Sequence, residues 1–351
     1  MNPQPKSLRA SCFLFLVLLI GFARAGHAQP GAILSPVLEV HGAVDKSGER
    51  GAVKSTLRTS DSVAEGNVIT SGADSGAVLS PLPGVEINVA HNTSVALVHL
   101  GLKKRGEAVQ SREVAQRLEV GTLSFSLDKL SASKTNFVVQ TPHGLMSAYG
   151  SVGTVTVVGS CVKIASVSGK VAFTPTSTSA VRTSIAIDPA PGSSSPMNES
   201  GNHPIVIKPG WFLAICGKGD KVEIRVIDTI ARTWTSFSSD GTQLSTRGAT
   251  VQEMESTRGF FATALENAAV AVSYGVLGAE GSAEVTDTLT KINQSFAEVG
   301  LAPIEASAIG SSKRGRNLSP ASAPESPGSP GFSGGPTNPA NTSGEVISRE
   351  R

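Results

Sequence analysis

The fold class of this 351-residue chain is decided by residues 63–89, which contain Val63-Ala64-Glu65-Gly66-Asn67-Val68-Ile69-Thr70-Ser71-Gly72-Ala73-Asp74-Ser75-Gly76-Ala77-Val78-Leu79 and Pro83-Gly84-Val85-Glu86-Ile87-Asn88-Val89. Val85, Ile87 and Val89 alternate with polar residues, which is the period of a strand with one buried face. Glycines separate the apolar pieces, because glycine takes positive φ without steric cost. The stretch therefore predicts short strands joined by tight turns.

The same pattern extends outward from Val37 to about Val226. Short alternating segments broken by Gly, Asp, Asn and Pro are typical of a domain with many strands and turns. We therefore predict a β domain over residues 29–230, in which one side chain in two along each strand faces inward. The candidate core residues are Val68, Val78, Leu79, Ile87, Val89, Leu118, Val120, Leu123, Val138, Val155, Val157, Ile164 and Val171.

Two segments interrupt this pattern. Residues 101–117 have few apolar positions and are interpreted as a basic loop, either a solvated one or a binding patch, with Lys103, Lys104, Arg105, Arg112 and Arg117 as its cations. Residues 174–204 are rich in Ser, Thr and Pro and are interpreted as an inserted loop with one strand at residues 181–187. Surface turns tolerate such insertions because the entropy of loop closure rises slowly with length.

A helical period replaces the β pattern after Thr229. Apolar residues recur every three to four positions in two sets, Phe261, Leu265, Ala268 and Val272, then Val285, Leu289, Ile292, Phe296 and Val299. This predicts two amphipathic helices over residues 250–300, the second with Ser282 as N-cap and Gly300 as its stop. Each apolar stripe must be covered by the β domain, the other helix or a partner. Residues 311–351 are rich in Pro, Ser and Gly and are predicted to be a disordered tail.

The N-terminus has the charge, apolar core and small residues of a secretory signal peptide. Lys6 and Arg9 precede an apolar run that starts at Cys12. Both Ala25 and Ala28 end a small-x-small cleavage pattern, and we favour Ala28, which would leave Gln29 as the mature N-terminus. The run holds roughly a dozen apolar residues, whereas a membrane-spanning helix needs about twenty. We therefore predict that residues 1–28 direct export and that no stable membrane span remains after cleavage, which places the protein in the periplasm, the outer envelope or outside a bacterial cell.

Composition limits the classes of partner. A net charge of +2 with 5% aromatic residues offers neither a strong basic field nor a base-stacking surface, so nucleic acid is not expected as a partner. Cleavage at Ala28 would leave Cys161 and Cys216 as the cysteines of the mature chain. In an oxidising compartment they are a candidate disulfide, and the alternative is two buried unpaired thiols.

Several stretches, in their order along residues 62–173 and 208–215, resemble the FecR domain, a module of the bacterial envelope. The first matching segment is Val63–Leu79, and the second is the turn at Gly84 with the strand after it. The later segments are Leu118-Glu119-Val120-Gly121-Thr122-Leu123, Phe137-Val138-Val139-Gln140-Thr141-Pro142-His143-Gly144, Val167-Ser168-Gly169-Lys170-Val171 and Lys208-Pro209-Gly210. The residues that match the family's motifs are Gly66, Thr70, Gly72, Asp74, Ser75, Gly84, Gly121, Thr141, Pro142, Gly144, Gly150, Gly169 and Gly210.

The resemblance implies a mainly β fold in which short strands wind in a solenoid-like or β-helix-like stack, followed here by the helical region and the tail. The pattern of strands and turns by itself also fits a sandwich. Family members that regulate sigma factors have a cytoplasmic segment and a membrane span before this domain, whereas only eleven residues precede the apolar run here. Direct control of a sigma factor is therefore not expected.

No stretch of the sequence favours catalysis. Gly331-Phe332-Ser333-Gly334-Gly335 has the spelling of a hydrolase nucleophile elbow but lies in the predicted tail, without the strand and helix that this motif needs. Asp74-Ser75-Gly76 fits a turn better than a serine nucleophile. The histidines, of which His91 and His99 lie near strands, lack helical metal-binding spacing, and nothing brings Asp61, Glu65, Asp74 and Glu86 into one cleft. We expect no catalytic residue, cofactor or metal.

The sequence thus predicts an exported, non-catalytic FecR-like envelope protein that binds, senses or scaffolds another envelope protein or a cell-surface polymer. The alternative is a structural or surface protein of the cell envelope, associated with glycan. The sequence leaves the oligomeric state open.

Overall fold

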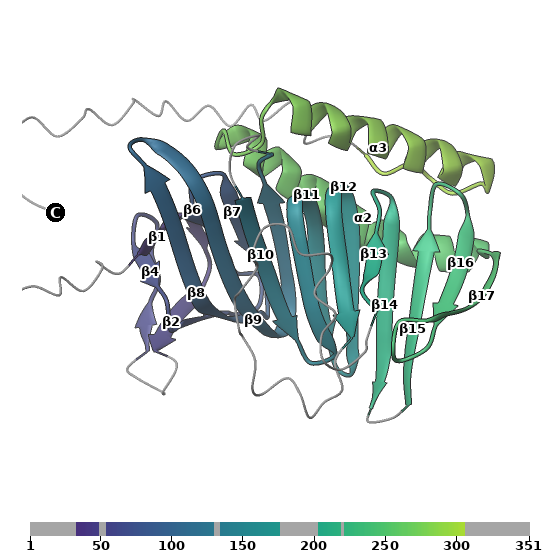
Figure 1. The fold of residues 1–351 in the computed structure, drawn as a ribbon, viewed down its shortest axis with the longest axis horizontal. Helices are drawn as coiled ribbons and strands as arrows, with labels where there is room; N and C mark the ends of the chain where they lie inside the picture. The colour runs from purple at the N-terminus through teal and green to yellow at the C-terminus, as the bar shows by residue number, and fades with distance from the viewer. Residues whose placement is uncertain (1–32, 49–53, 130–133, 176–202, 219–220, 306–351) are drawn as a thin grey trace, which may run out of the picture. The chain divides into compact units, whose positions relative to one another are not determined.

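The computed structural model describes residues 33–48, 54–129, 134–175, 203–218 and 221–305, and these contain seventeen strands and two helices (Figure 1). The predicted signal peptide, most of the predicted inserted loop with its 181–187 strand, the serine motif at 331–335 and the predicted tail lie outside the described residues. The strands are β1 Leu34–His41, β2 Val44–Gly48, β3 Ser55–Thr56, β4 Ser62–Ala64, β5 Asn67–Ser71, β6 Gly76–Leu82, β7 Val85–Val89, β8 Ser94–Arg105, β9 Ala108–Leu127, β10 Lys134–Thr141, β11 Gly144–Val158, β12 Cys161–Pro175, β13 Ile205–Ile207, β14 Trp211–Lys218, β15 Lys221–Asp228, β16 Thr233–Phe237 and β17 Gln243–Gly248. The helices are α2 Val251–Ser273 and α3 Ala279–Glu298.

The mainly β class with a small helical region is confirmed, and strand pairing gives the arrangement. The strands form two layers that share β9, β11 and β12. The first layer runs β3-β2-β5-β8-β9-β10-β11-β12-β13, and the second runs β1-β6-β7-β9-β11-β12-β14-β15-β16-β17. The short strand β4 pairs with the start of β1. Pairings between described strands are antiparallel except for β9 with β10, so the layers are sandwich-like and not parallel stacked rungs.

The shared strands change layers at glycines. The first half of β9 pairs with β10 through Ser111–Arg117, and its second half pairs with β11 through Gly121–Ser126. Gly121, Gly150 and Gly169 have φ of +97°, +51° and +72°, the left-handed region that favours glycine. A Cβ at Gly169 would lie 2.1 Å from the carbonyl oxygen of Gly150. These glycines therefore make the bends that let one strand belong to both layers.

The main hydrophobic core contains residues of both layers, such as Phe125, Phe137, Phe173 and Ile215. The prediction is confirmed for Val78, Leu79, Ile87, Val89, Leu118, Leu123, Val155, Val157, Ile164 and Val171, all of which are buried. It is wrong for Val120, which is 46% exposed beside the Gly121 bend, and Val68 and Val138 are only half-buried. On β10 the inward residues are Phe137 and Val139, so the predicted phase of that strand was shifted by one residue.

The basic loop expected at residues 101–117 is instead a hairpin of β8 and β9. The expectation failed because Arg112 and Gln116 occupy buried positions that an apolar residue would normally fill, which hid the alternation. Strands also continue beyond residue 230, since β16 and β17 extend the second layer.

Helix α2 covers the outer face of the second layer. Thr250 and Glu253 form a capping box at its start, and Glu253 also pairs with Arg247 of β17. Phe260 packs on Phe212 of β14 with ring centroids 5.0 Å apart, and the hydroxyl of Tyr274 donates to Glu39 of β1 at 3.1 Å. The helix therefore crosses several strands and buries its apolar stripe on the sheet.

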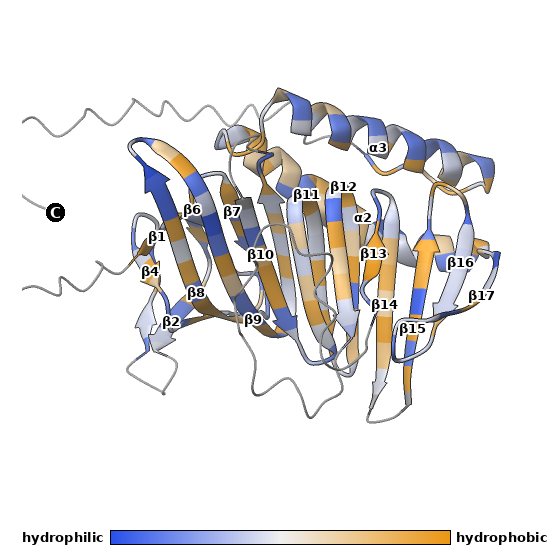
Figure 2. Cartoon of the chain, viewed as in Figure 1, coloured by the Kyte–Doolittle hydropathy of each residue, from blue (hydrophilic) through white to orange (hydrophobic). Residues whose placement is uncertain are grey.

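Helix α3 packs in the same second hydrophobic cluster through Val285, Leu289, Ile292 and Phe296. It starts one turn earlier than predicted, with Gly278 as N-cap instead of Ser282, and Gly300 follows its end at φ +76° as expected of a stop. Figure 2 shows the polar face of α3 turned away from the sheet. Neither of the two described helices is long and apolar enough to span a bilayer.

Candidate functional site: a polar junction between the sheet and the helices

A cavity of about 200 Å³ lies where the strand bends meet the connection from α2 to α3. We call this place the junction. One wall comes from the end of β9 and the bends of β11 and β12, and the other comes from the start of α3. The lining residues are Leu127, Asp128, Lys129, Gly150, Ser168, Leu277, Gly278, Ala279, Glu280 and Gly281.

Glu284 of α3 ties the helix to the bends at the junction. One carboxylate oxygen accepts from the backbone N–H of Gly169 at 3.0 Å, and the other pairs with the ammonium of Lys129. A Cβ at Gly150 would lie 2.5 Å from the Cγ of Lys129, so this glycine leaves the room that the lysine needs. Glu284 thus joins α3 both to Gly169 of β12 and to Lys129 after β9 through one carboxylate.

Arg112 of β9 is fully buried next to the junction. Its guanidinium donates to the carbonyl oxygen of Pro83 at 2.6 Å, to that of Asp128 at 3.1 Å and to the hydroxyl of Thr135 at 2.6 Å. Burial lowers the pKa of Arg112, and the nearby Asp128 acts in the opposite direction. A Cβ at Gly84 would lie 2.2 Å from Nη1 of Arg112, so only glycine at this turn before β7 leaves space for the guanidinium.

A second buried polar group lies under α2. Glu86 of β7 is fully buried and directly opposite Ser126 of β9, whose hydroxyl accepts a hydrogen bond from the Asn267 amide of α2 at 3.0 Å. Within the described residues, neither carboxyl oxygen of Glu86 nor Oδ1 of Asn267 has a hydrogen-bond partner. Burial raises the pKa of Glu86 to about 8. Glu86 is therefore mainly protonated, and so uncharged, at neutral pH.

The junction brings together three of the glycines that match the family motifs. Gly150 lines the cavity, Gly169 binds Glu284, and Gly84 accepts from the backbone N–H of Asp128 at 2.9 Å. The remaining motif residues are spread over turns and strand ends elsewhere, namely Gly66, Thr70, Gly72, Asp74, Ser75, Gly121, Thr141, Pro142, Gly144 and Gly210. The motif residues thus lie mainly at turns and bends and do not together form a single binding site.

The Asp74-Ser75 segment is a turn, as expected. Asp74 has φ +51°, and the hydroxyl of Ser75 accepts from the backbone N–H of Ala43 and donates to the carbonyl oxygen of Ala73, both at 2.9 Å. At the β10–β11 turn the hydroxyl of Thr141 donates to the carbonyl oxygen of Gly144 at 2.9 Å. Both hydroxyls form hydrogen bonds with backbone groups and so stabilise their turns.

Asp61, Glu65 and His99, which were also considered in the sequence, have local partners. Asp61 accepts from the backbone N–H of Arg58, and Glu65 lies 3.1 Å from Nδ1 of His99. The second ring nitrogen of His99 lies 3.7 Å from Glu113. Across the described residues, no three His, Cys, Asp or Glu side chains are placed to hold a metal ion.

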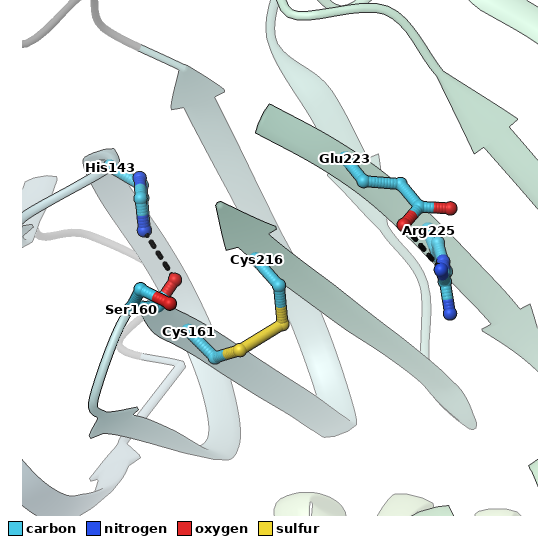
Figure 3. Close-up of a disulfide and its surroundings, with 6 residues drawn as sticks. All are labelled: His143, Ser160, Cys161, Cys216, Glu223 and Arg225. Atoms are coloured by element: carbon cyan, nitrogen blue, oxygen red, sulfur yellow. Dashed lines mark hydrogen bonds and ion pairs between the residues drawn. A yellow bond between two sulfur atoms is a disulfide. The ribbon is translucent and has the colours of Figure 1, made fainter. Parts of the chain in front are cut away.

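The structure joins Cys161 and Cys216 in a disulfide between β12 and β14 (Figure 3). The two residues are directly opposite in the antiparallel pair, with Cα atoms 4.1 Å apart. Beside them the carbonyl oxygen of Ser160 lies 2.9 Å from Nε2 of His143 and accepts from the backbone N–H of Gly217 at 3.1 Å. The bond therefore closes one end of the second layer near the turn that carries His143.

Sequence reasoning missed Arg112 as a buried residue, and also Lys129, Glu284 and Asn267. Arg112 carries a usable signal, because it stands at the inward phase of the alternation that continues through Val114 and Leu118. The other three depend on contacts between residues more than 100 positions apart, such as Asn267 with Ser126, and no local pattern reveals them.

Comparison with known proteins gives few matches. No protein-family model matches the chain, and no curated protein matches it. Two crystal structures of a protein from Parabacteroides distasonis, described as a candidate anti-sigma factor, align with a TM-score of 0.29 and sequence identities of 11% and 12%. Each alignment covers 45% of this chain and 58% of the matched chain, so it spans little more than half of that protein.

Proposed function

We propose that this protein is an exported, non-catalytic, FecR-like module of the bacterial envelope that binds another envelope protein. The observation that carries the export part of this proposal is the Cys161–Cys216 disulfide. Disulfides persist in oxidising compartments such as the periplasm and are rare in the cytosol. The bond and the signal-peptide pattern of residues 1–28 are separate features, and both favour export.

The chemistry of the junction supports binding or sensing in preference to catalysis. Lys129 and Glu284 neutralise each other, and the guanidinium of Arg112 is bonded to backbone carbonyls and to Thr135. A catalytic site needs a nucleophile within hydrogen-bond reach of a base, with room for a reacting atom beside both. The junction instead links α3 to the strand bends, so a partner that binds α3 would contact a helix that is bonded directly to the sheet.

Crosslinking in living cells tests this function. We expect a photocrosslinker at Asp287 or Gln294, both on the exposed face of α3, to capture one discrete envelope protein. A crosslinker at Ser55 of β3, exposed and distant in sequence from α3, is the matched control. The full chain and a chain ending at Ser311 should capture the same protein. Recovery of only this protein itself, or of wall polymer, would contradict the proposal and favour a structural protein of the cell surface.

A further inference from the structure

The β8–β9 hairpin projects beyond the first layer as a free ribbon. Its neighbour β5 pairs with β8 only at Ser94–Ala96, and β10 pairs with β9 from Ser111 onward. Residues 103–108, which we call the tip, pair only within the β8–β9 hairpin among the described strands, with Lys103 opposite Ser111, Lys104 opposite Val109 and Arg105 opposite Ala108. Gly106, at φ +63°, is the first residue of the two-residue turn between β8 and β9.

The tip concentrates positive charge. Lys103, Lys104 and Arg105 are consecutive and exposed, and their cross-strand neighbours are Ser111, Val109 and Ala108. Cross-strand carboxylates would offset the repulsion between such cations, and the ribbon has none at these positions. Figure 2 shows the end of β8 as strongly hydrophilic.

Arginines elsewhere in the described chain pair with carboxylates. Examples are Arg225 with Glu223, Arg232 with Glu298 and Arg258 with Glu255. Within the described residues the three tip cations have no ion pair or side-chain hydrogen bond, and Glu107 is the single acidic residue of the tip. Among the described residues, the tip is therefore a cluster of cations at the end of a hairpin without an internal partner.

We propose that the tip docks the protein onto the phosphate headgroups of an anionic lipid bilayer. Successive residues of a strand point to opposite faces, so the cations surround the end of the ribbon and reach a flat surface together when it approaches end-on. An anionic bilayer attracts each Lys or Arg near its surface, and this attraction fades within a Debye length. The inference goes beyond the proposed function and does not depend on the protein partner.

Vesicle sedimentation tests the docking. The probes are vesicles of phosphatidylcholine alone and vesicles that also contain phosphatidylglycerol. We expect the full chain to bind the anionic vesicles and the K103Q/K104Q/R105Q variant to bind them about 100-fold more weakly. The variant K54Q/R58Q/K170Q removes the same charge from other exposed positions and should keep wild-type binding. Binding to anionic vesicles should disappear at about 1 M salt, where the Debye length is roughly 3 Å.

The comparison of the two triple variants decides the proposal, because an apolar N-terminal segment would bind both kinds of vesicle in every variant equally. Equal binding of wild type and tip variant to anionic vesicles overturns the docking, and so does a wild type that binds neither kind of vesicle. A loss that is equal in the two triple variants also overturns it, because binding would then follow net charge and not the tip.

Discussion

In the wild-type protein the free energy of unfolding is expected to fall as pH rises from about 5 to 8, and replacing Glu86 by glutamine is expected to abolish most of this fall. The pKa of Glu86 is raised to about 8 in the folded protein by burial, against 4.5 for the free side chain. Between these values the unfolded chain has lost the proton and the folded chain keeps it, so the free energy of unfolding falls as pH rises. The slope is about 1.4 kcal/mol per pH unit, and the total is on the order of 4 kcal/mol.

The sign follows from the raised pKa. The contribution of Glu86 is fully present below about pH 4.5 and is lost as pH rises through about 8. Urea unfolding at several pH values measures it, and E107Q, at an exposed carboxylate of the hairpin turn, is the control that should keep the wild-type slope. A wild type whose stability is flat over this range would show that Glu86 is already ionised in the folded protein.

Replacing Arg112 by methionine is expected to destabilise the protein by about 3–5 kcal/mol. Methionine fills much of the space but leaves the carbonyl oxygens of Pro83 and Asp128 buried without their donor. The R112K variant keeps the charge, but its single nitrogen cannot reach all the acceptors that the three guanidinium nitrogens reach, so an intermediate loss is expected. Urea unfolding followed by circular dichroism gives the difference.

An exposed arginine serves as the control for Arg112. R225A removes a surface pair with Glu223 and should cost only about 0–1 kcal/mol. If R112M were as stable as R225A, the guanidinium would not hold the Gly84 turn and the end of β9 together, and the account of the junction would be wrong.

The mainly β class and the two helices could be predicted from the sequence because they depend on local periods. Ile87 and Val89 show a period of two, and Val285, Leu289 and Ile292 show a helical period, and all five are buried as expected. The turns could be predicted as well, since Gly66 and Gly84 take the positive φ for which glycine is suited. Local patterns of this kind survive because each residue needs only its own neighbours to satisfy them.

The sharing of strands between two layers could not be predicted from the sequence. The glycines Gly150 and Gly169 can be recognised as bends only when the pairing of β11 with β12 is known. The sequence of β10 also does not reveal which face is buried, because Phe137, Val138 and Val139 are all apolar. The junction escaped prediction for two reasons. Arg112 is a charged residue at a core position, and Glu284 meets Gly169 across 115 residues of chain.

The central claim, that the protein is exported and oxidised, is tested most directly by mass spectrometry of the protein recovered from the cell envelope without reducing agent. The account predicts a chain that begins at Gln29 and in which Cys161 and Cys216 resist alkylation until they are reduced. A chain that still begins at Met1, with both thiols alkylated before reduction, would contradict it.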